Sequence, residues 1–143
     1  MRALERRVKA DPHMEHISAK YAHSILSRRI ISCAMRVHRN LGPGLLESAY
    51  RSCLARQLAL DGLAFEQEVP IPIRYEGLEM QCAYRADIIV DRSVLLELKA
   101  VETLLPIHQA QVLAYLRLSG LHLGLLLNFN AVTLKDGIRR FVR

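Results

Sequence analysis

Two carboxylates and an amine lie within a stretch of sequence that is otherwise almost entirely aliphatic. Asp87 precedes the apolar run 88–90, and Glu97 and Lys99 follow the apolar run 94–96. Side chains alternate between the two faces of a strand, so Glu97 and Lys99 share a face. Burying charges without partners is costly in free energy, and a divalent cation is the partner that two carboxylates favour.

The polar triplet 91–93 between the two apolar runs predicts a β-hairpin with a short loop. If the residues that flank the triplet pair, the antiparallel register places Asp87 opposite Glu97. Magnesium takes oxygen ligands, and the Lys99 amine beside it can stabilise charge on a phosphate or help to activate a water. The alternative is a surface hairpin with a cross-strand Glu–Lys pair. The aliphatic arms instead favour a sheet that is covered on both faces.

The composition is typical of one globular domain, with 143 residues, of which 51% are hydrophobic and 24% charged. The 20 Lys and Arg residues exceed the 14 Asp and Glu residues and give a net charge of +6. This excess favours a polyanionic partner such as nucleic acid, although many basic proteins bind none. Cys33, Cys53 and Cys82 are widely spaced, which favours reduced, buried thiols in the cytoplasm. The apolar stretch 121–129 is too short to cross a membrane.

Hydrophobic periodicity predicts two helices after a flexible, basic N-terminal tail at residues 1–20. Either Met1 or Met14 can serve as the natural start. Apolar residues recur at three- and four-residue steps over 24–40, which predicts an amphipathic helix with an arginine-rich outer face. A second helix is expected over 45–60, and a single domain over 21–143.

The middle of the chain changes to a two-residue period, which predicts strands over 67–75 and 78–84 before the hairpin. A helix is expected over 103–119, followed by a buried strand over 121–129 and a basic C-terminal tail. The predicted order is α-α-β-β-β-β-α-β. One mixed sheet flanked by helices is therefore the expected α/β architecture.

Two further groups of residues could line the same site. Glu47 and Tyr50 lie one helical turn apart, and Glu47 either adds a third carboxylate or only complements the helix dipole. A tyrosine in the position of Tyr50 is more often a core residue than a catalytic one. His108, Gln111 and Tyr115 share one helix face. They either position phosphate oxygens or form the solvent-exposed side of an amphipathic helix.

Four short strings resemble one family of proteins. The spacing Gly44-x-x-Glu47-x-x-Tyr50 matches the signature of the GxxExxY family, a branch of the PD-(D/E)XK nuclease superfamily. Tyr-Arg-Ala-Asp at 84–87, Glu-Leu-Lys-Ala at 97–100 and Leu-Asn-Phe-Asn at 127–130 are also similar to that family. The resemblance extends from Ile25 to the C-terminus. One departure is alanine in place of proline before the first acidic residue of the hairpin, and this position carries no chemistry.

The resemblance implies a restriction-endonuclease-like core of order α-β-β-β-α-β, here with an extra N-terminal helix. It implies that Asp87, Glu97 and the main-chain carbonyl of Leu98 bind magnesium, with manganese as a substitute. Lys99 would be catalytic, and Glu47 would supply a further acidic group from the first core helix.

The resemblance also implies that Gln111 and Tyr115 form a QxxxY element beside the site, and we add His108 and Tyr50 as substrate-positioning candidates. The expected function is a cytoplasmic, magnesium-dependent nuclease that acts on DNA in preference to RNA, with no membrane partner. The alternative is a non-catalytic module that binds nucleic acid or protein. A homo-oligomer stays open, and an oligomeric scaffold rests only on the apolar strand 121–129.

Overall fold

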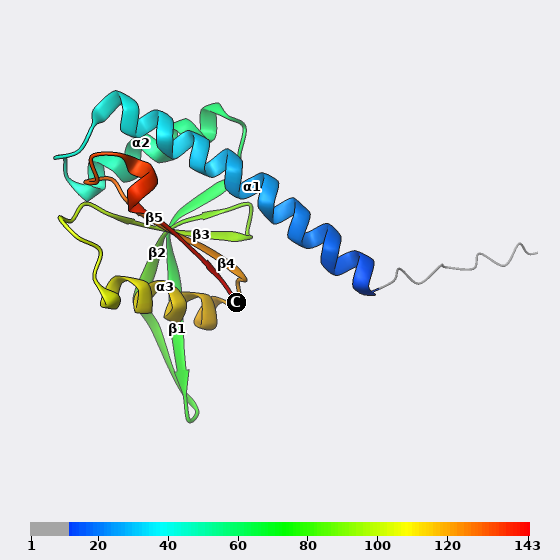
Figure 1. Cartoon of the computed structure of the whole chain (residues 1–143). Coiled ribbons are helices and arrows are strands. Elements are labelled where there is room, and N and C mark those ends of the chain that lie inside the picture. The colour runs from blue at the N-terminus through cyan, green and yellow to red at the C-terminus, as the bar shows by residue number, and fades with distance from the viewer. Residues whose placement is uncertain (1–11) are drawn as a thin grey trace, which may run out of the picture.

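The computed structural model describes the backbone of residues 12–143, and the side chains of residues 23–143 other than 82 and 83. A central sheet has α1 and α2 on one face and α3 on the other (Figure 1). This is the predicted α/β architecture. The elements are α1 (Pro12–Leu41), α2 (Glu47–Leu60), β1 (Phe65–Tyr75), β2 (Leu78–Val90), β3 (Val94–Lys99), α3 (Pro106–Ser119), β4 (Leu123–Asn128), the short 3₁₀ helix η1 (Leu134–Gly137) and β5 (Ile138–Val142).

The sheet is mixed, as predicted, and its strands follow the order β1-β2-β3-β4-β5. Strand β3 pairs with β4 in parallel, and the other neighbouring strands pair antiparallel. A parallel pair needs a crossover connection, and α3 supplies it between β3 and β4. Helix α3 begins at Pro106 and ends before Gly120, which has the left-handed conformation (φ 73°) that favours glycine.

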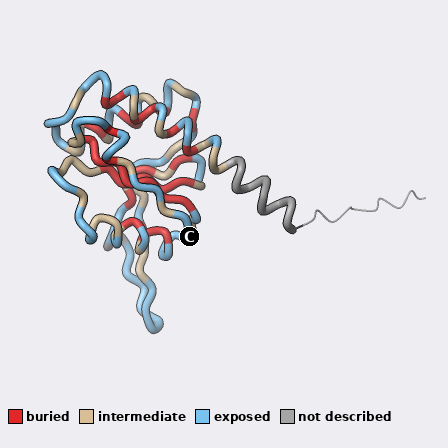
Figure 2. The backbone as a smooth tube through the Cα atoms, in the orientation of Figure 1, coloured by how far each residue is buried: buried red, intermediate tan, exposed pale blue. Residues whose placement is uncertain are grey.

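Both faces of the sheet are covered, as the aliphatic strands predict. The side chains of Leu96 and Leu98 pack in the cluster beneath α1 and α2, whereas Leu95 packs in the cluster beneath α3. Every residue of β4 is buried, and so is β3 up to its last residue. Figure 2 shows this buried centre, together with the exposed far end of the β1–β2 hairpin, which projects from the body of the protein.

Three expected elements differ from those observed. The first helix begins at Pro12 rather than at residue 24, and residues 1–11 lie outside the described part of the chain. The expected separate strands before and after residue 85 form one continuous strand, β2, because β1 pairs along nearly its whole length. The expected basic tail contains η1 and the edge strand β5, whose exposed Arg139 and Arg140 conceal the strand pattern in the sequence.

The prediction of buried thiols is right for Cys33 and wrong for Cys53, which lies on the exposed side of α2. The Cys82 side chain lies outside the described residues. Burial raises the pKa of the Cys33 thiol to about 11, and the nearby Asp61 side chain adds to this rise, so the thiol stays protonated at neutral pH. No described helix combines the length and hydrophobicity required to span a membrane.

Candidate active site

The predicted hairpin register is present in the structure. Strands β2 and β3 pair from Val90 and Val94 through two further residue pairs, which brings Asp87 opposite Glu97. The Asp87 amide donates a hydrogen bond to Glu97 Oε1 (3.1 Å), and the Leu98 amide donates one to Asp87 Oδ2 (2.8 Å). Each carboxylate is therefore fixed by the main chain of the strand that carries the other.

Several elements end or begin around these two carboxylates. Lys99 is the last residue of β3, Glu47 is the first residue of α2, and His108 lies in the first turn of α3. The charge of Lys99 acts on all three carboxyl groups, and the His108 ring lies within electrostatic range of Glu47. The structure therefore brings the predicted acidic residues and Lys99 within electrostatic range of one another near the C-terminal end of β3, the middle strand of the sheet.

Burial is the largest cause of the pKa shifts of the three carboxyl groups in this cluster. It raises the pKa of Glu97 to about 8, and the charge of Asp87 adds to the rise. Burial also raises the pKa of Asp87 and of Glu47, while the Lys99 ammonium lowers both. The Glu97 side chain is only 3% exposed, so water does little to stabilise its negative charge. The site consequently favours an added positive charge.

Arg51 belongs to this cluster, although it was not among the residues predicted from the sequence. Its guanidinium lies 3.7 Å from Asp87 Oδ1 and 3.6 Å from the carboxylate of Glu68. Glu68 has a positive φ of 49° within β1. The one available signal was the position of Arg51 one turn after Glu47, on the same helix face.

The predicted residues of α3 lie beside the carboxylates. Gln111 Nε2 donates a hydrogen bond to the Tyr115 hydroxyl (3.0 Å). Burial raises the pKa of Tyr115, the Gln111 hydrogen bond opposes this rise, and the charges of Glu97 and Asp87 add to it. The phenol is therefore within electrostatic range of both carboxylates. His108 Nδ1 accepts a hydrogen bond from the Leu105 amide, which leaves Nε2 as the protonated nitrogen of the neutral ring.

Tyr50 lies in the core rather than on the surface of the site. Its side chain is fully buried and stacks on Phe129, with the ring centroids 4.8 Å apart. The hydroxyl donates a hydrogen bond to the Gly42 carbonyl (2.6 Å) and accepts one from the Leu45 amide (3.1 Å). Tyr50 therefore holds the loop that leads into α2 and so positions Glu47.

We expect Tyr50→Phe to lower the free energy of unfolding by about 1–2 kcal/mol, because the partly buried hydrogen bonds to the Gly42 carbonyl and from the Leu45 amide are lost. Urea unfolding measures this loss. The matched control is Tyr75→Phe near the tip of the β1–β2 hairpin, where the side chain is 71% exposed and little change is expected. Equal stability of the two variants would contradict a structural role for the Tyr50 hydroxyl.

The oxygen atoms of the two carboxylates are potential ligands for a hard cation. Among the described residues, no cluster of three or more His, Cys, Asp or Glu side chains is already arranged as a metal site. Asp87 and Glu97 nevertheless each use one oxygen for a main-chain amide, and the second oxygen of Asp87 faces the positive charge of Arg51. This donor set consists of oxygen atoms and carries negative charge, which fits Mg²⁺ or Mn²⁺. Coordination by the Leu98 carbonyl stays a prediction.

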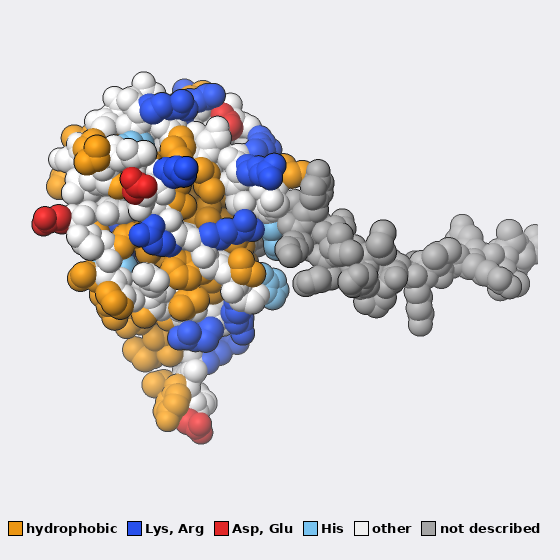
Figure 3. All heavy atoms as spheres, in the orientation of Figure 1, with side chains coloured by type: hydrophobic (Ala, Val, Ile, Leu, Met, Phe, Trp, Pro, Cys, Tyr) orange, Lys and Arg blue, Asp and Glu red, His pale blue; other side chains and the backbone are white. Residues whose placement is uncertain are grey.

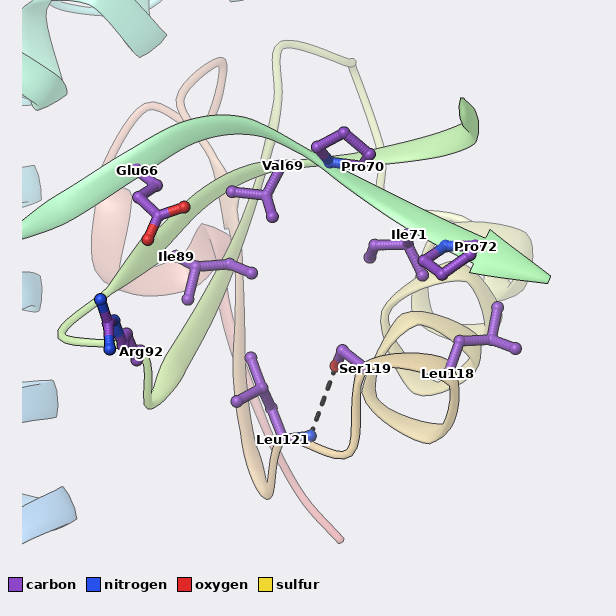
Figure 4. A pocket seen from close by; sticks show the side chains of 10 residues that line it. All are labelled: Glu66, Val69, Pro70, Ile71, Pro72, Ile89, Arg92, Leu118, Ser119 and Leu121. Atoms are coloured by element: carbon purple, nitrogen blue, oxygen red, sulfur yellow. Dashed lines mark hydrogen bonds between the residues drawn. The ribbon is translucent and has the colours of Figure 1, made fainter. Parts of the chain in front are cut away.

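A separate cavity of about 370 Å³ lies between β1 and the end of α3 and contains none of the predicted site residues. Figure 4 shows its largely apolar wall, formed by side chains such as Val69, Ile71 and Leu121. Glu66 and Arg92 lie at one side of it.

Comparison of the sequence with models of known protein families found one match. Residues 24–141 match the family model described as the PD-(D/E)XK nuclease superfamily. Searches of curated proteins and of solved structures found no significant match. The GxxExxY branch suggested by Gly44, Glu47 and Tyr50 stays a prediction. The match covers α2, α3, the hairpin with its carboxylates and the sheet up to residue 141. The chain belongs to the PD-(D/E)XK nuclease superfamily.

Proposed function

We propose that the protein is a magnesium-dependent nuclease that hydrolyses phosphodiester bonds in nucleic acid, with DNA preferred over RNA. The observation that carries this proposal is the hydrogen-bonded pair of Asp87 and Glu97 at the end of a buried hairpin, with Lys99 next along the same strand face. Three charged groups in a largely buried setting have little structural benefit by themselves. Their arrangement is suited to a cation and a phosphate.

Each residue then has a distinct role. Asp87 and Glu97 would hold the cation, with Glu47 as a third acidic group within electrostatic range. When bound, the cation would stabilise negative charge on the phosphate and make an attacking water more acidic. The Lys99 ammonium would neutralise charge that develops on the phosphate oxygens, and Gln111 and His108 would donate hydrogen bonds to them. Arg51 would keep Asp87 oriented.

The basic surface would supply contacts to the nucleic acid backbone that do not depend on sequence. Figure 3 shows Lys and Arg side chains spread over the face that carries α1 and β5. Four arginines are exposed on α1, and two of them, Arg29 and Arg36, interact with Asp61 at the end of α2. The other two, Arg28 and Arg39, are therefore the better candidates for phosphate contacts. A cytoplasmic location stays a prediction.

The second candidate is a non-catalytic module that keeps the nuclease fold for binding. The interaction of Arg51 with Asp87 favours this candidate, because a guanidinium can take the place of a cation permanently. Such a module would bind nucleic acid in a salt-sensitive way, without turnover and with little effect of magnesium. Whether the chain forms a homo-oligomer is independent of this choice.

A panel of labelled substrates distinguishes the two candidates. Single- and double-stranded DNA and RNA would be incubated with the protein in Mg²⁺, in Mn²⁺ and in EDTA, and both cleavage and binding would be measured. Cleavage of DNA that requires the metal supports the nuclease. Binding without cleavage in every metal condition supports the non-catalytic module, and cleavage of RNA alone contradicts the preference for DNA.

A further inference from the structure

A groove of about 550 Å³ lies between α3 and the β1–β2 hairpin. Its wall is mostly apolar and includes two tyrosines, and its polar groups are an amide, an imidazole and a guanidinium. Hydrophobic side chains gather over α3 and the neighbouring hairpin in Figure 3. The described residues that line the groove are Ile73, Tyr84, Ile107, His108, Ala110, Gln111, Ala114, Tyr115, Arg117 and Leu118.

The groove follows from the sequence of α3. Residues at steps of three and four along the helix form one stripe on its surface, and Ile107, Gln111, Ala114 and Leu118 have this spacing. Alanine at 114 occupies little of the space between helix and hairpin. The side chains of Ile107 and Leu118 are 67% and 40% exposed, so this apolar stripe is open to a ligand.

The groove shares residues with the neighbourhood of the candidate active site. Tyr115 forms part of its wall and is also within electrostatic range of Glu97 and Asp87. Gln111 and His108 line the groove as well, and the His108 ring is within electrostatic range of Glu47. A ligand that fills the groove would therefore contact residues that lie near the carboxylates.

The groove also has the charge and shape for part of a polyanion. Arg117 carries the one permanent charge among the described lining residues, and none of them is a carboxylate. The Tyr84 side chain is 47% exposed, and its ring lies 5.9 Å from that of Tyr115, centroid to centroid, at an angle of 53°. The tilt leaves Tyr84 as an aromatic surface at the side of the groove rather than as part of a closed stack.

We propose that this groove holds an unstacked nucleobase of the strand whose phosphate lies at Lys99, so that the preferred substrate is single-stranded. This inference rests on the proposed function. Tyr84 would stack on the base, and Arg117 would contact the adjoining phosphate. A paired base could enter only after unstacking, which costs a few kcal/mol and disfavours duplexes.

Binding in EDTA tests this proposal without requiring catalysis. Fluorescence anisotropy would compare a labelled single-stranded DNA, its duplex and a strand of the same length in which every nucleotide is abasic. The wild-type protein is expected to bind the single strand about tenfold or more tightly than either of the other two. Equal affinity for the abasic strand would overturn the assignment of a base and would leave the groove to a protein partner.

Substitutions in the groove test whether the preference for single strands arises there. Tyr84→Ala is expected to weaken single-strand binding by about fivefold to 100-fold, and Tyr84→Phe to retain it. Ala114→Leu should fill the groove and weaken binding similarly, whereas Gln109→Leu adds the same side chain to α3 outside the groove and should change nothing. Thermal unfolding checks that each variant is folded. Wild-type affinity of Tyr84→Ala would overturn the proposal even if Ala114→Leu does not fold.

The two proposals fail in different ways. Loss of single-strand binding in Tyr84→Ala, with no cleavage by the wild-type protein in any metal, would support the base groove and reject the nuclease. Metal-dependent cleavage that Tyr84→Ala and Ala114→Leu leave unchanged would reject the base groove and support the nuclease.

Discussion

Replacement of Lys99 by methionine is expected to lower the rate of magnesium-dependent DNA cleavage by about 10²- to 10³-fold. Methionine keeps the apolar part of the side chain and removes the ammonium that lies within electrostatic range of Glu47, Asp87 and Glu97. Without it, charge that develops on the phosphate loses a preorganised partner. Single-turnover cleavage of labelled DNA measures this effect on the chemical step.

The same variant should still bind the cation, because Asp87 and Glu97 are unchanged. The matched control is Lys135→Met on η1, which removes an exposed lysine outside the carboxylate cluster and should leave cleavage at the wild-type rate. Equal loss of activity in both variants would attribute the effect to net charge. Wild-type activity of Lys99→Met would remove Lys99 from the proposed chemistry.

In EDTA, the free energy of unfolding is expected to fall as the pH rises from about 4.5 to about 8. The folded-state pKa of Glu97 is raised to about 8 from 4.5, chiefly by burial. Between these values the folded protein binds more protons than the unfolded chain, so stability is highest at low pH and is lost as the pH rises. The raised pKa values of Asp87 and Glu47 act in the same direction.

Glu97→Gln should remove most of this fall and stabilise the metal-free protein at pH 8 by about 3 kcal/mol. Glutamine can still accept the hydrogen bond from the Asp87 amide but carries no charge. Denaturant unfolding at a series of pH values measures the effect, and Glu66→Gln on the exposed side of β1 is the control. An unchanged pH dependence in Glu97→Gln would contradict the burial of a carboxylate in a negatively charged cluster.

The sequence is sufficient to predict the hairpin and its register because local rules determine both. The polar triplet 91–93 sets the loop, and once Val90 pairs with Val94 the two-residue period places Asp87 opposite Glu97. Hydrophobic periodicity likewise predicts a sheet of aliphatic strands that is covered by helices on both faces. For these elements the side chains that specify the structure are neighbours in the sequence.

Contacts between distant segments are not predictable in this way. Arg51 interacts with Glu68 and Asp87, which lie on two different strands, and no spacing rule connects these residues. The edge strand β5 contains exposed Arg139 and Arg140, so its composition is typical of a charged tail. Pairing with β4, rather than an apolar pattern of its own, makes it a strand.

Tyr50 shows a second reason why part of the site could not be predicted from the sequence. Its spacing from Glu47 is equally compatible with a surface position and with a core position. The structure selects the core, because the hydroxyl finds a donor and an acceptor in the loop before α2 and the ring stacks on Phe129. A residue of the motif can therefore act through the backbone that it supports rather than through contact with a substrate.

The most direct test of a metal-dependent active site is the rate of DNA cleavage as a function of Mg²⁺ concentration, measured for the wild-type protein and for Asp87→Asn. Asparagine keeps the acceptor for the Leu98 amide and removes the charge. The wild-type rate should rise to saturation with Mg²⁺ and vanish in EDTA, and Asp87→Asn should remain inactive or require far more metal. Identical curves for the two proteins, or cleavage by the wild-type protein in EDTA, would contradict the proposed site.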